Sequence, residues 1–490
     1  MLGRKVALGA LWLVGARLAA KGMDLLAMLI VARILTPEDF GLVALAATVL
    51  VILYTVSDLS LANALIRMHD PDKHAYDTAF TLNLMRGLVL AGCLVGLAWP
   101  MAALYADPRL VDLMLVLALV PLFRAMLSPR MAHLARGLMF RQAFVLEASG
   151  KAAAFVASVG VAMATGSYWA LIAGLVAAPA LSSAISYLLA PYRPAFILVH
   201  WRAIFAFSGW LTASHVVNTL NWHADRFFIG GHLGTAALGQ YTVGSELASL
   251  PTNAPMLPMM QALYAGFARL ADDLERLRTA YLASQSIVMA LAVPLGLIVA
   301  VLAEPVIVLA IGPRWLDAAF VVQVLAPVIA FQMLTGAAQS ATMATGLTRM
   351  IFRRDLTALA IRLPLILGGL YLFGFEGVVW ARVASGLASI GLNLHMIRRA
   401  LGAPLTDQLL APWRSIVSGS LMVLGLLAAM RALPVAGVDH TTLLLHTVAL
   451  GVAGVGIYVA VHLLLWLAAG RPAGPESRLI RLVRPRTFPV

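Results

Sequence analysis

The chain has 490 residues, of which 61% are hydrophobic and 12% are charged, whereas soluble domains are about 45–50% apolar and about 25% charged. This composition excludes a soluble globular enzyme. The formal net charge of +13 would suit a nucleic-acid partner, but the basic residues fall mostly in short segments between apolar runs, so no nucleic-acid partner is expected. A single cysteine, Cys93, excludes an internal disulfide and Cys-based metal sites, and we expect no cofactor and no metal.

Apolar segments long enough to cross a bilayer recur along the whole chain. About 20 helical residues span the hydrocarbon core, and this length gives about fourteen segments. They cover roughly residues 8–34, 40–66, 76–104, 109–129, 141–165, 168–190, 203–231, 236–266, 279–311, 318–346, 350–373, 376–398, 413–435 and 441–469. The prolines at 251, 255, 258 and 294 are expected to bend or break their helices. The first segment is longer than a signal-peptide core, so we expect it to be retained.

Basic residues between the segments predict the topology. On the side of the termini we count 23 Lys and Arg, and on the opposite side only Arg33, Arg109, Arg314 and Arg431. By the positive-inside rule both termini are expected to be cytoplasmic. Since no loop exceeds roughly 20 residues, no soluble catalytic domain is expected, and any function must take place within the bilayer.

The chain contains a weak internal echo at an offset of 198 residues. It pairs Trp12 with Trp210, Leu35 with Leu233 and Gly41 with Gly239. The identities are at chance level, but both copies consist of a long helix with polar residues, a short loop and a second long helix. This order predicts two six-helix halves, residues 1–200 and 201–400, followed by two additional helices within 401–470 and a basic cytoplasmic tail at 471–490.

Ionisable residues inside the first segment are the first candidates for a functional site. Such residues cost about 2.5–3.5 kcal/mol each on insertion and usually face a cavity or a partner. Arg17, Lys21 and Asp24 are spaced i, i+4 and i+7, which places them on one helix face. Two cations on one stripe favour an anion between them, although Lys21 and Asp24 could instead neutralise each other.

The seventh segment is polar over an arc too wide to face lipid. Its candidates are His215, Trp222, Asp225 and Arg226. Asp225 and Arg226 are neighbours that point about 100° apart on a helix, so they cannot form a simple self-contained pair. Packing against neighbouring helices is the competing interpretation for each of these side chains.

Other segments add charges and neutral polar groups. Candidates for charge balance or ion coupling are Asp24, Asp58, Asp225 and Glu246, and candidates for substrate binding are Arg17, Lys21, Arg86, His215, Trp222, Arg226, Gln332 and Gln339. Gln332 and Gln339 share a predicted stripe with Thr335 and Thr342 that suits sugar hydroxyls or helix packing. Glu147 and Lys151 are expected to form an i,i+4 ion pair. Together these residues predict a cationic cavity that favours phosphate or pyrophosphate.

Several motifs resemble a known family. Val31–Leu42 (VARILTPEDFGL), Ser57–Ile66 (SDLSLANALI), Asp225–Gly234 (DRFFIGGHLG) with Leu238–Tyr241 (LGQY), and Gly312–Trp315 (GPRW) are similar to signatures of bacterial polysaccharide flippases of the Wzx-like type. These belong to the multidrug/oligosaccharidyl-lipid/polysaccharide exporter superfamily. The resemblance implies an all-α polytopic membrane protein with two six-helix bundles in a V-shaped arrangement and two extra C-terminal helices.

The resemblance also implies a function. Such proteins flip undecaprenyl-pyrophosphate-linked glycan across the bacterial inner membrane for O-antigen, capsule or exopolysaccharide assembly. Partners would be membrane lipids and possibly a polysaccharide polymerase and a chain-length regulator. In this interpretation Arg17, Lys21, Arg86 and Arg226 would bind pyrophosphate or acidic sugar. The alternatives are an ion-coupled drug or metabolite antiporter of the same superfamily, a glycan polymerase or ligase, which would need a larger extracytoplasmic loop, and a non-transporting scaffold.

Overall fold

The computed structural model describes residues 20–57, 72–136, 140–199, 209–432 and 439–471. By their internal contacts the residues form two units, Met1–Gly239 and Gln240–Val490. Within the described residues the regular structure is entirely helical. Arg17 and Asp58 lie outside the described residues, and the side chain of His215 is also outside the description. The expected boundaries at 200, 400 and 470 remain predictions.

The first unit contains a helix over residues 20–34 and seven complete helices. These are α2 (Pro37–Val56), α4 (Lys73–Tyr105), α5 (Arg109–Leu117), α6 (Leu119–Ala125), α7 (Met131–Arg136), α8 (Phe140–Thr165) and α9 (Trp169–Leu189). Thr36 begins α2 with a reciprocal capping box to Asp39, and Asp72 caps the first turn of α4. Helices α8 and α9 pack along each other, and α4 packs on α5 and α6.

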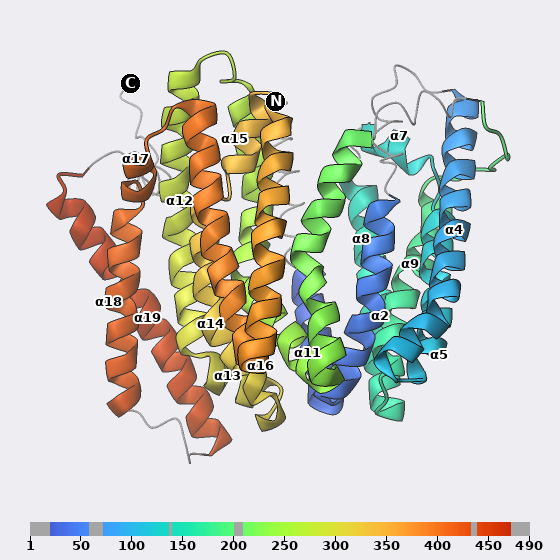
Figure 1. Ribbon diagram of the computed structural model, residues 1–490, viewed down its shortest axis with the longest axis horizontal. Helices are drawn as coiled ribbons and strands as arrows, with labels where there is room; N and C mark the ends of the chain where they lie inside the picture. Colours follow the sequence, from blue (N-terminus) through green and yellow to red (C-terminus); the bar gives the residue numbers. More distant parts are fainter. Residues whose placement is uncertain (1–19, 58–71, 137–139, 200–208, 433–438, 472–490) are drawn as a thin grey trace, which may run out of the picture. The chain divides into compact units, whose positions relative to one another are not determined.

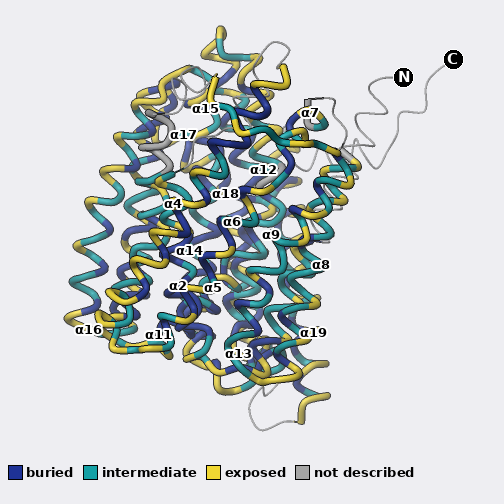
Figure 2. The backbone as a smooth tube through the Cα atoms, turned by 90° about the vertical axis from the view of Figure 1, so that its right-hand side faces the viewer, coloured by how far each residue is buried: buried dark blue, intermediate teal, exposed yellow. Residues whose placement is uncertain are grey.

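The second unit contains the helices from α12 onward. They are α12 (Leu274–Val301), α13 (Ala303–Ala310), α14 (Leu316–Gln332), α15 (Ala338–Ala344), α16 (Thr348–Leu401), α17 (Leu405–Leu410), α18 (Trp413–Ala432) and α19 (His440–Ala468). Helix α14 packs between α12 and α16, while α18 packs against α12 and α19 (Figure 1). Figure 2 shows that α14 is largely buried, whereas α16 and α19 are mostly intermediate or exposed, as expected where a helix faces lipid.

Two glycines divide the longest helices. Helix α11 (Gly209–Ala268) contains Gly234 at φ 84°, and α16 contains Gly374 at φ 60°. Both conformations are open to glycine and strained for other residues, so each element consists of two helices. The breaks fall in the gaps expected between residues 231 and 236 and between 373 and 376. Nine helices among the described residues are long and apolar enough to cross a membrane.

Helix continuity differs from the sequence expectation at two places. The backbone stays helical through Pro251, Pro255 and Pro258 in α11 and through Pro294 in α12, so these prolines do not end their helices. The expected segment at 318–346 largely coincides with one candidate membrane span, Pro313–Ala344, but within it α14 ends at Gln332, a 3₁₀ turn covers Met333–Thr335, and α15 begins at Ala338. Neighbouring helices can satisfy the backbone groups that proline leaves unbonded, which explains why α11 and α12 continue through their prolines.

An extended strap, residues 191–199, follows α9 and lies along the first turns of α4. The buried carboxylate of Asp77 accepts hydrogen bonds on Oδ1 from Tyr192 Oη at 2.6 Å and from Ala195 N at 2.8 Å. One helical turn later, Thr81 Oγ1 accepts from Ile197 N at 3.1 Å. Burial, followed by the bond to Asp77, raises the pKa of Tyr192, so its phenol remains a donor at neutral pH. The side chains of Asp77 and Thr81 thus accept the backbone hydrogen bonds that a neighbouring strand would otherwise accept from the strap.

Candidate functional site

Two arginines from different helices of the first unit meet at one aromatic ring. Arg86 on α4 and Arg124 on α6 place their Cζ atoms 5.4 Å and 4.9 Å from the ring centroid of Tyr54 on α2. Both distances are within the range of cation–π attraction. Because Arg86 is half-buried and Arg124 is exposed, the cluster combines a fixed cation with an accessible one. We call Tyr54, Arg86 and Arg124 the arginine cluster.

Arg86 is held in place by the end of α2. Its Nε donates to Ser57 Oγ at 3.0 Å, and its Nη2 donates to the carbonyl oxygen of Tyr54 at 2.9 Å. Carbonyl oxygens in the last turn of a helix lack intrahelical partners and carry partial negative charge, so a guanidinium is favourable there. Arg86, predicted as a substrate-binding residue, is therefore oriented by backbone as well as by the ring.

Arg124 is placed to bind an anion. Among the described residues, its guanidinium forms no ion pair with a carboxylate, and its described contact is the face of Tyr54. The Tyr54 hydroxyl is buried and has no hydrogen-bond partner within the described part of the chain. Two cations and a spare hydroxyl in an apolar helical unit are suited to a phosphate or carboxylate group, since charge-assisted hydrogen bonds are strong in such surroundings.

Sequence reasoning missed Arg124 as a site residue. It stands alone in the apolar run Leu119–Ala125, without the polar neighbours that drew attention to the first and seventh segments. The available signal was the insertion cost of a lone arginine inside a span. The structure also places two guanidinium groups against the ring of Tyr54, a residue outside the predicted set of site residues.

Asp24 and Lys151 form an ion pair between two segments of the first unit. Lys151 Nζ on α8 lies 2.7 Å from Asp24 Oδ2 and 2.9 Å from Oδ1, with both side chains about one-third exposed, at 35% and 34%. The expected in-helix pair of Lys151 with Glu147 was therefore wrong, since the carboxylate of another helix approaches more closely. Neutralisation of Asp24 by Lys21 is also not seen, and Lys21 is exposed.

This pair predicts a compensating double substitution. Lys151→Met should lower the unfolding temperature because it leaves the Asp24 carboxylate without its partner inside an apolar unit. Asp24→Asn should also lower the unfolding temperature, because it leaves the ammonium group of Lys151 without its partner. The double variant should recover most of the loss, measured by thermal unfolding of purified protein in detergent. Additive losses would show that the two groups act independently.

The first part of α11 carries the remaining candidates of the first unit. Asp225 is 2% exposed and its Oδ1 accepts from the backbone N of Arg226 at 3.1 Å, while Trp222 is 45% exposed. Arg226 is half-buried. Thr219 Oγ1 donates to Thr55 Oγ1 at 3.2 Å, which ties this helix to α2 one residue from Tyr54.

Candidates on the second unit form no single stripe. Gln332 is half-buried at the end of α14, whereas Gln339 on α15 and Glu246 on α11 are exposed. The intervening 3₁₀ turn rotates Gln339 away from the register that an unbroken helix would give. Thr335 Oγ1 donates to the carbonyl oxygen of Gln332 at 3.2 Å. These groups belong to the second unit, and their part in substrate binding stays a prediction.

No metal centre is found in the parts of the chain that the structure describes, because no three His, Cys, Asp or Glu side chains gather there.

Residues 30–320 match the family model described as "Polysaccharide biosynthesis protein". The chain belongs to this family.

Individual relatives agree with the family match. The succinoglycan biosynthesis transport protein ExoT of Rhizobium meliloti is 26% identical over 84% of each chain. The lipopolysaccharide biosynthesis protein WzxC of Escherichia coli is 24% identical over 84% of this chain and 85% of that protein. The chain is thus a multi-pass membrane protein from a family of transporters in polysaccharide biosynthesis, and not an enzyme.

Solved structures show the fold. The lipid II flippase MurJ in an inward closed conformation superposes with a TM-score of 0.75 at 12% identity, covering 94% of this chain and all of MurJ (100%). An inward-facing multidrug resistance transporter of the MATE family gives a TM-score of 0.60 at 15% identity, covering 80% of this chain and 99% of that one. The fold is therefore that of MurJ and of the MATE transporters.

Proposed function

We infer that this protein moves undecaprenyl-pyrophosphate-linked oligosaccharide from the cytoplasmic to the extracytoplasmic leaflet of the bacterial inner membrane. The polymer served would be O-antigen, capsule or exopolysaccharide, and a polysaccharide polymerase and chain-length regulator would act on the product. Membership of a polysaccharide-transport family and the MurJ-like fold support this class of substrate.

The observation that carries the proposal is the arginine cluster. The described residues place two guanidinium groups at Tyr54 and keep Asp24 in an ion pair, an arrangement that suits an anion better than a cationic drug. Pyrophosphate has several oxygens that can accept from both arginines at once, which matches the planar donor geometry of guanidinium. Release of the substrate would then leave each cation against the ring of Tyr54.

Transport would proceed by alternating access. The pyrophosphate and sugars would occupy the polar interior while the polyprenyl tail stays in lipid, so that the head group never crosses hydrocarbon. Because a ligand shifts an equilibrium only by its differential affinity for two states, the cluster must bind the anion more tightly in the cytoplasm-facing state than in the releasing state.

Deleting the gene from its host tests the function. Surface polysaccharide should disappear while lipid-linked oligosaccharide accumulates in a form inaccessible to a glycosidase added outside spheroplasts. Restoring the gene should reverse both effects. Accumulation of oligosaccharide that the external glycosidase can digest would place the block after translocation and contradict the proposal.

A further inference from the structure

The starts of two helices touch backbone to backbone in the first unit. Gly41 lies in the second turn of α2, and Gly239 lies just after the break at Gly234 in α11. A Cβ atom added at Gly41 would lie 1.7 Å from the carbonyl oxygen of Thr235, and one added at Gly239 would lie 1.7 Å from that of Pro37. We call this contact of residues 37–41 with 235–239 the glycine crossing.

The glycine crossing is reciprocal in a way that reflects the internal echo. At the offset of 198 residues, positions 37 and 41 correspond to 235 and 239, and the contact joins 41 to 235 and 239 to 37. Each segment therefore meets the equivalent segment of the other copy through the same residues, as at a local two-fold axis. This contact explains why glycine occurs at both positions although the copies otherwise agree only at chance level.

Polar bonds join each segment of the glycine crossing, or the residue next to it, to a neighbouring turn. Arg109, after the turn that follows α4, donates to Glu38 at the start of α2 at 2.6 Å. In the second unit, Gln240, the residue after Gly239, donates to the carbonyl oxygen of Arg314 at 2.7 Å and accepts from Ala318 N at 3.0 Å. Residues adjoining each side of the crossing are thus held by polar bonds to a neighbouring turn.

The crossing itself is held by weak contacts. The close approach directs a glycine hydrogen at a carbonyl oxygen on each side, and Cα–H···O contacts contribute only about 0.5–1 kcal/mol each. Parting the backbones at residues 37–41 and 235–239 would leave the backbone hydrogen bonds within both helices intact. The contact leaves no room for a side chain at either glycine and is weak enough to open.

The charge pattern places the crossing on the extracytoplasmic side, because it lies beside Arg33 and the turn at Arg109, both on the side poor in basic residues. Tyr54 of the arginine cluster lies 13 residues beyond Gly41 along α2, about 20 Å toward the cytoplasm at 1.5 Å per residue. We propose that the glycine crossing is the extracytoplasmic seal of the transport path and that it parts to let the substrate out. The proposal rests on the proposed function.

Bulky residues at either glycine should hold the seal open. Even the single methyl of alanine would require the backbones to separate by about 2 Å to restore ordinary contact of roughly 3.5 Å. In a Cys93→Ser background with Ser57→Cys as probe, an impermeant maleimide added outside should label slowly. Gly41→Leu should raise this labelling rate at least about tenfold, and Gly239→Leu should have the same effect because the contact is reciprocal.

Two controls separate opening from loose packing. Gly92→Leu adds a side chain where nothing lies within 4 Å. Gly369→Leu disrupts another close backbone approach, 2.3 Å from the Cβ position to the carbonyl oxygen of Gly377, within a hairpin of the second unit. Neither should raise outside labelling. If Gly41→Leu and Gly239→Leu fail to fold, Gly41→Ala and Gly239→Ala replace them in the test, and a smaller rise in the outside labelling rate is expected.

The outcomes distinguish this inference from the proposed function, since labelling requires no substrate. Unchanged outside labelling in folded Gly41 and Gly239 variants, or an equal rise in Gly369→Leu, would overturn the seal. A selective rise would support it even if the transported substrate were something other than a lipid-linked glycan.

Discussion

Replacing Arg86 and Arg124 together with alanine should abolish polysaccharide export while the protein is still made and inserted. Hydrogen bonds to charged groups contribute about 1.5–3 kcal/mol each, so losing either guanidinium should weaken binding of a pyrophosphate head group roughly 10–100-fold. Arg124→Ala should act mainly on binding, because its described contact is the Tyr54 ring. Arg86→Ala should also lower the unfolding temperature, because Arg86 bonds the end of α2. Surface polymer per cell, normalised to protein level, measures the effect.

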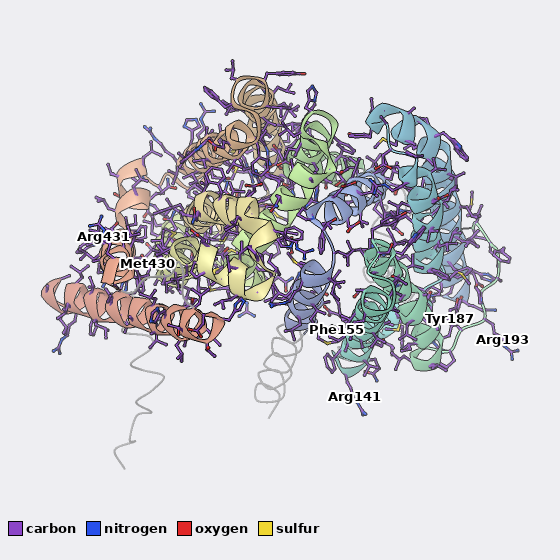
Figure 3. All side chains as sticks on the ribbon, turned by 90° about the horizontal axis from the view of Figure 1, so that it is seen from below. Arg141, Phe155, Tyr187, Arg193, Met430 and Arg431 are labelled. Carbon is purple, nitrogen blue, oxygen red and sulfur yellow. The ribbon has the colours of Figure 1, made fainter. Side chains whose placement is uncertain are left out.

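Arg141→Ala provides the matched control for this prediction. Arg141 is an exposed arginine near the start of α8, and its side chain points away from the helices (Figure 3). Removing it takes away one positive charge without touching the arginine cluster. Export should remain near the wild-type level. Equal loss in Arg141→Ala would mean that overall charge, rather than the cluster, is responsible.

Replacing Asp77 with alanine should strongly destabilise the first unit. The Tyr192 hydroxyl and the Ala195 amide would both lose a buried acceptor, and an unsatisfied buried polar group costs about 1–3 kcal/mol. Together the two losses predict a fall of roughly 2–5 kcal/mol in the free energy of unfolding. Thermal unfolding in detergent, followed by loss of intact monomer on size-exclusion chromatography, measures the change.

Asp77→Asn distinguishes bonding from charge. Only Oδ1 of Asp77 accepts the strap's hydrogen bonds, while Oδ2 is buried without a partner in the described part of the chain. An asparagine amide oxygen can accept both bonds, so this variant should keep most of the stability that Asp77→Ala loses. Asp112→Ala, at an exposed position on α5, should be neutral. A loss in Asp77→Asn equal to that in Asp77→Ala would indicate that the negative charge itself is required.

The membrane-spanning helices and the breaks between them could be predicted because they depend on local sequence. Apolar runs of about 20 residues identify spans, and the gaps around Gly234 and Gly374 coincide with the positive φ angles found there. The proline-rich stretch of α11 stays helical where a bend or break was expected. Whether proline interrupts a helix depends on the neighbours that satisfy its backbone groups. The break after Gln332 had no local signal of comparable strength.

The candidate site was only partly predictable for a different reason. Charge and span position indicated Arg86 and Asp24, but partners come from helices far apart in the sequence. Lys151 pairs with Asp24 at a separation of 127 residues, not with Glu147 four residues away. Arg124 reaches Tyr54 from α6, and Asp77 is bound by the strap at 191–199. Such pairings follow from tertiary packing, which periodicity within one helix does not encode.

The most direct test is translocation by the purified protein. Wild-type protein, the Arg86→Ala/Arg124→Ala variant and Arg141→Ala would each be reconstituted in liposomes with a fluorescent undecaprenyl-pyrophosphate-linked oligosaccharide. An impermeant glycosidase would report which leaflet holds the sugar. We expect rapid exchange for wild type and Arg141→Ala, and no exchange above protein-free liposomes for the double variant. Exchange at the wild-type rate in the double variant would contradict the arginine cluster as the binding site, and no exchange with wild-type protein under any ion gradient would contradict flipping.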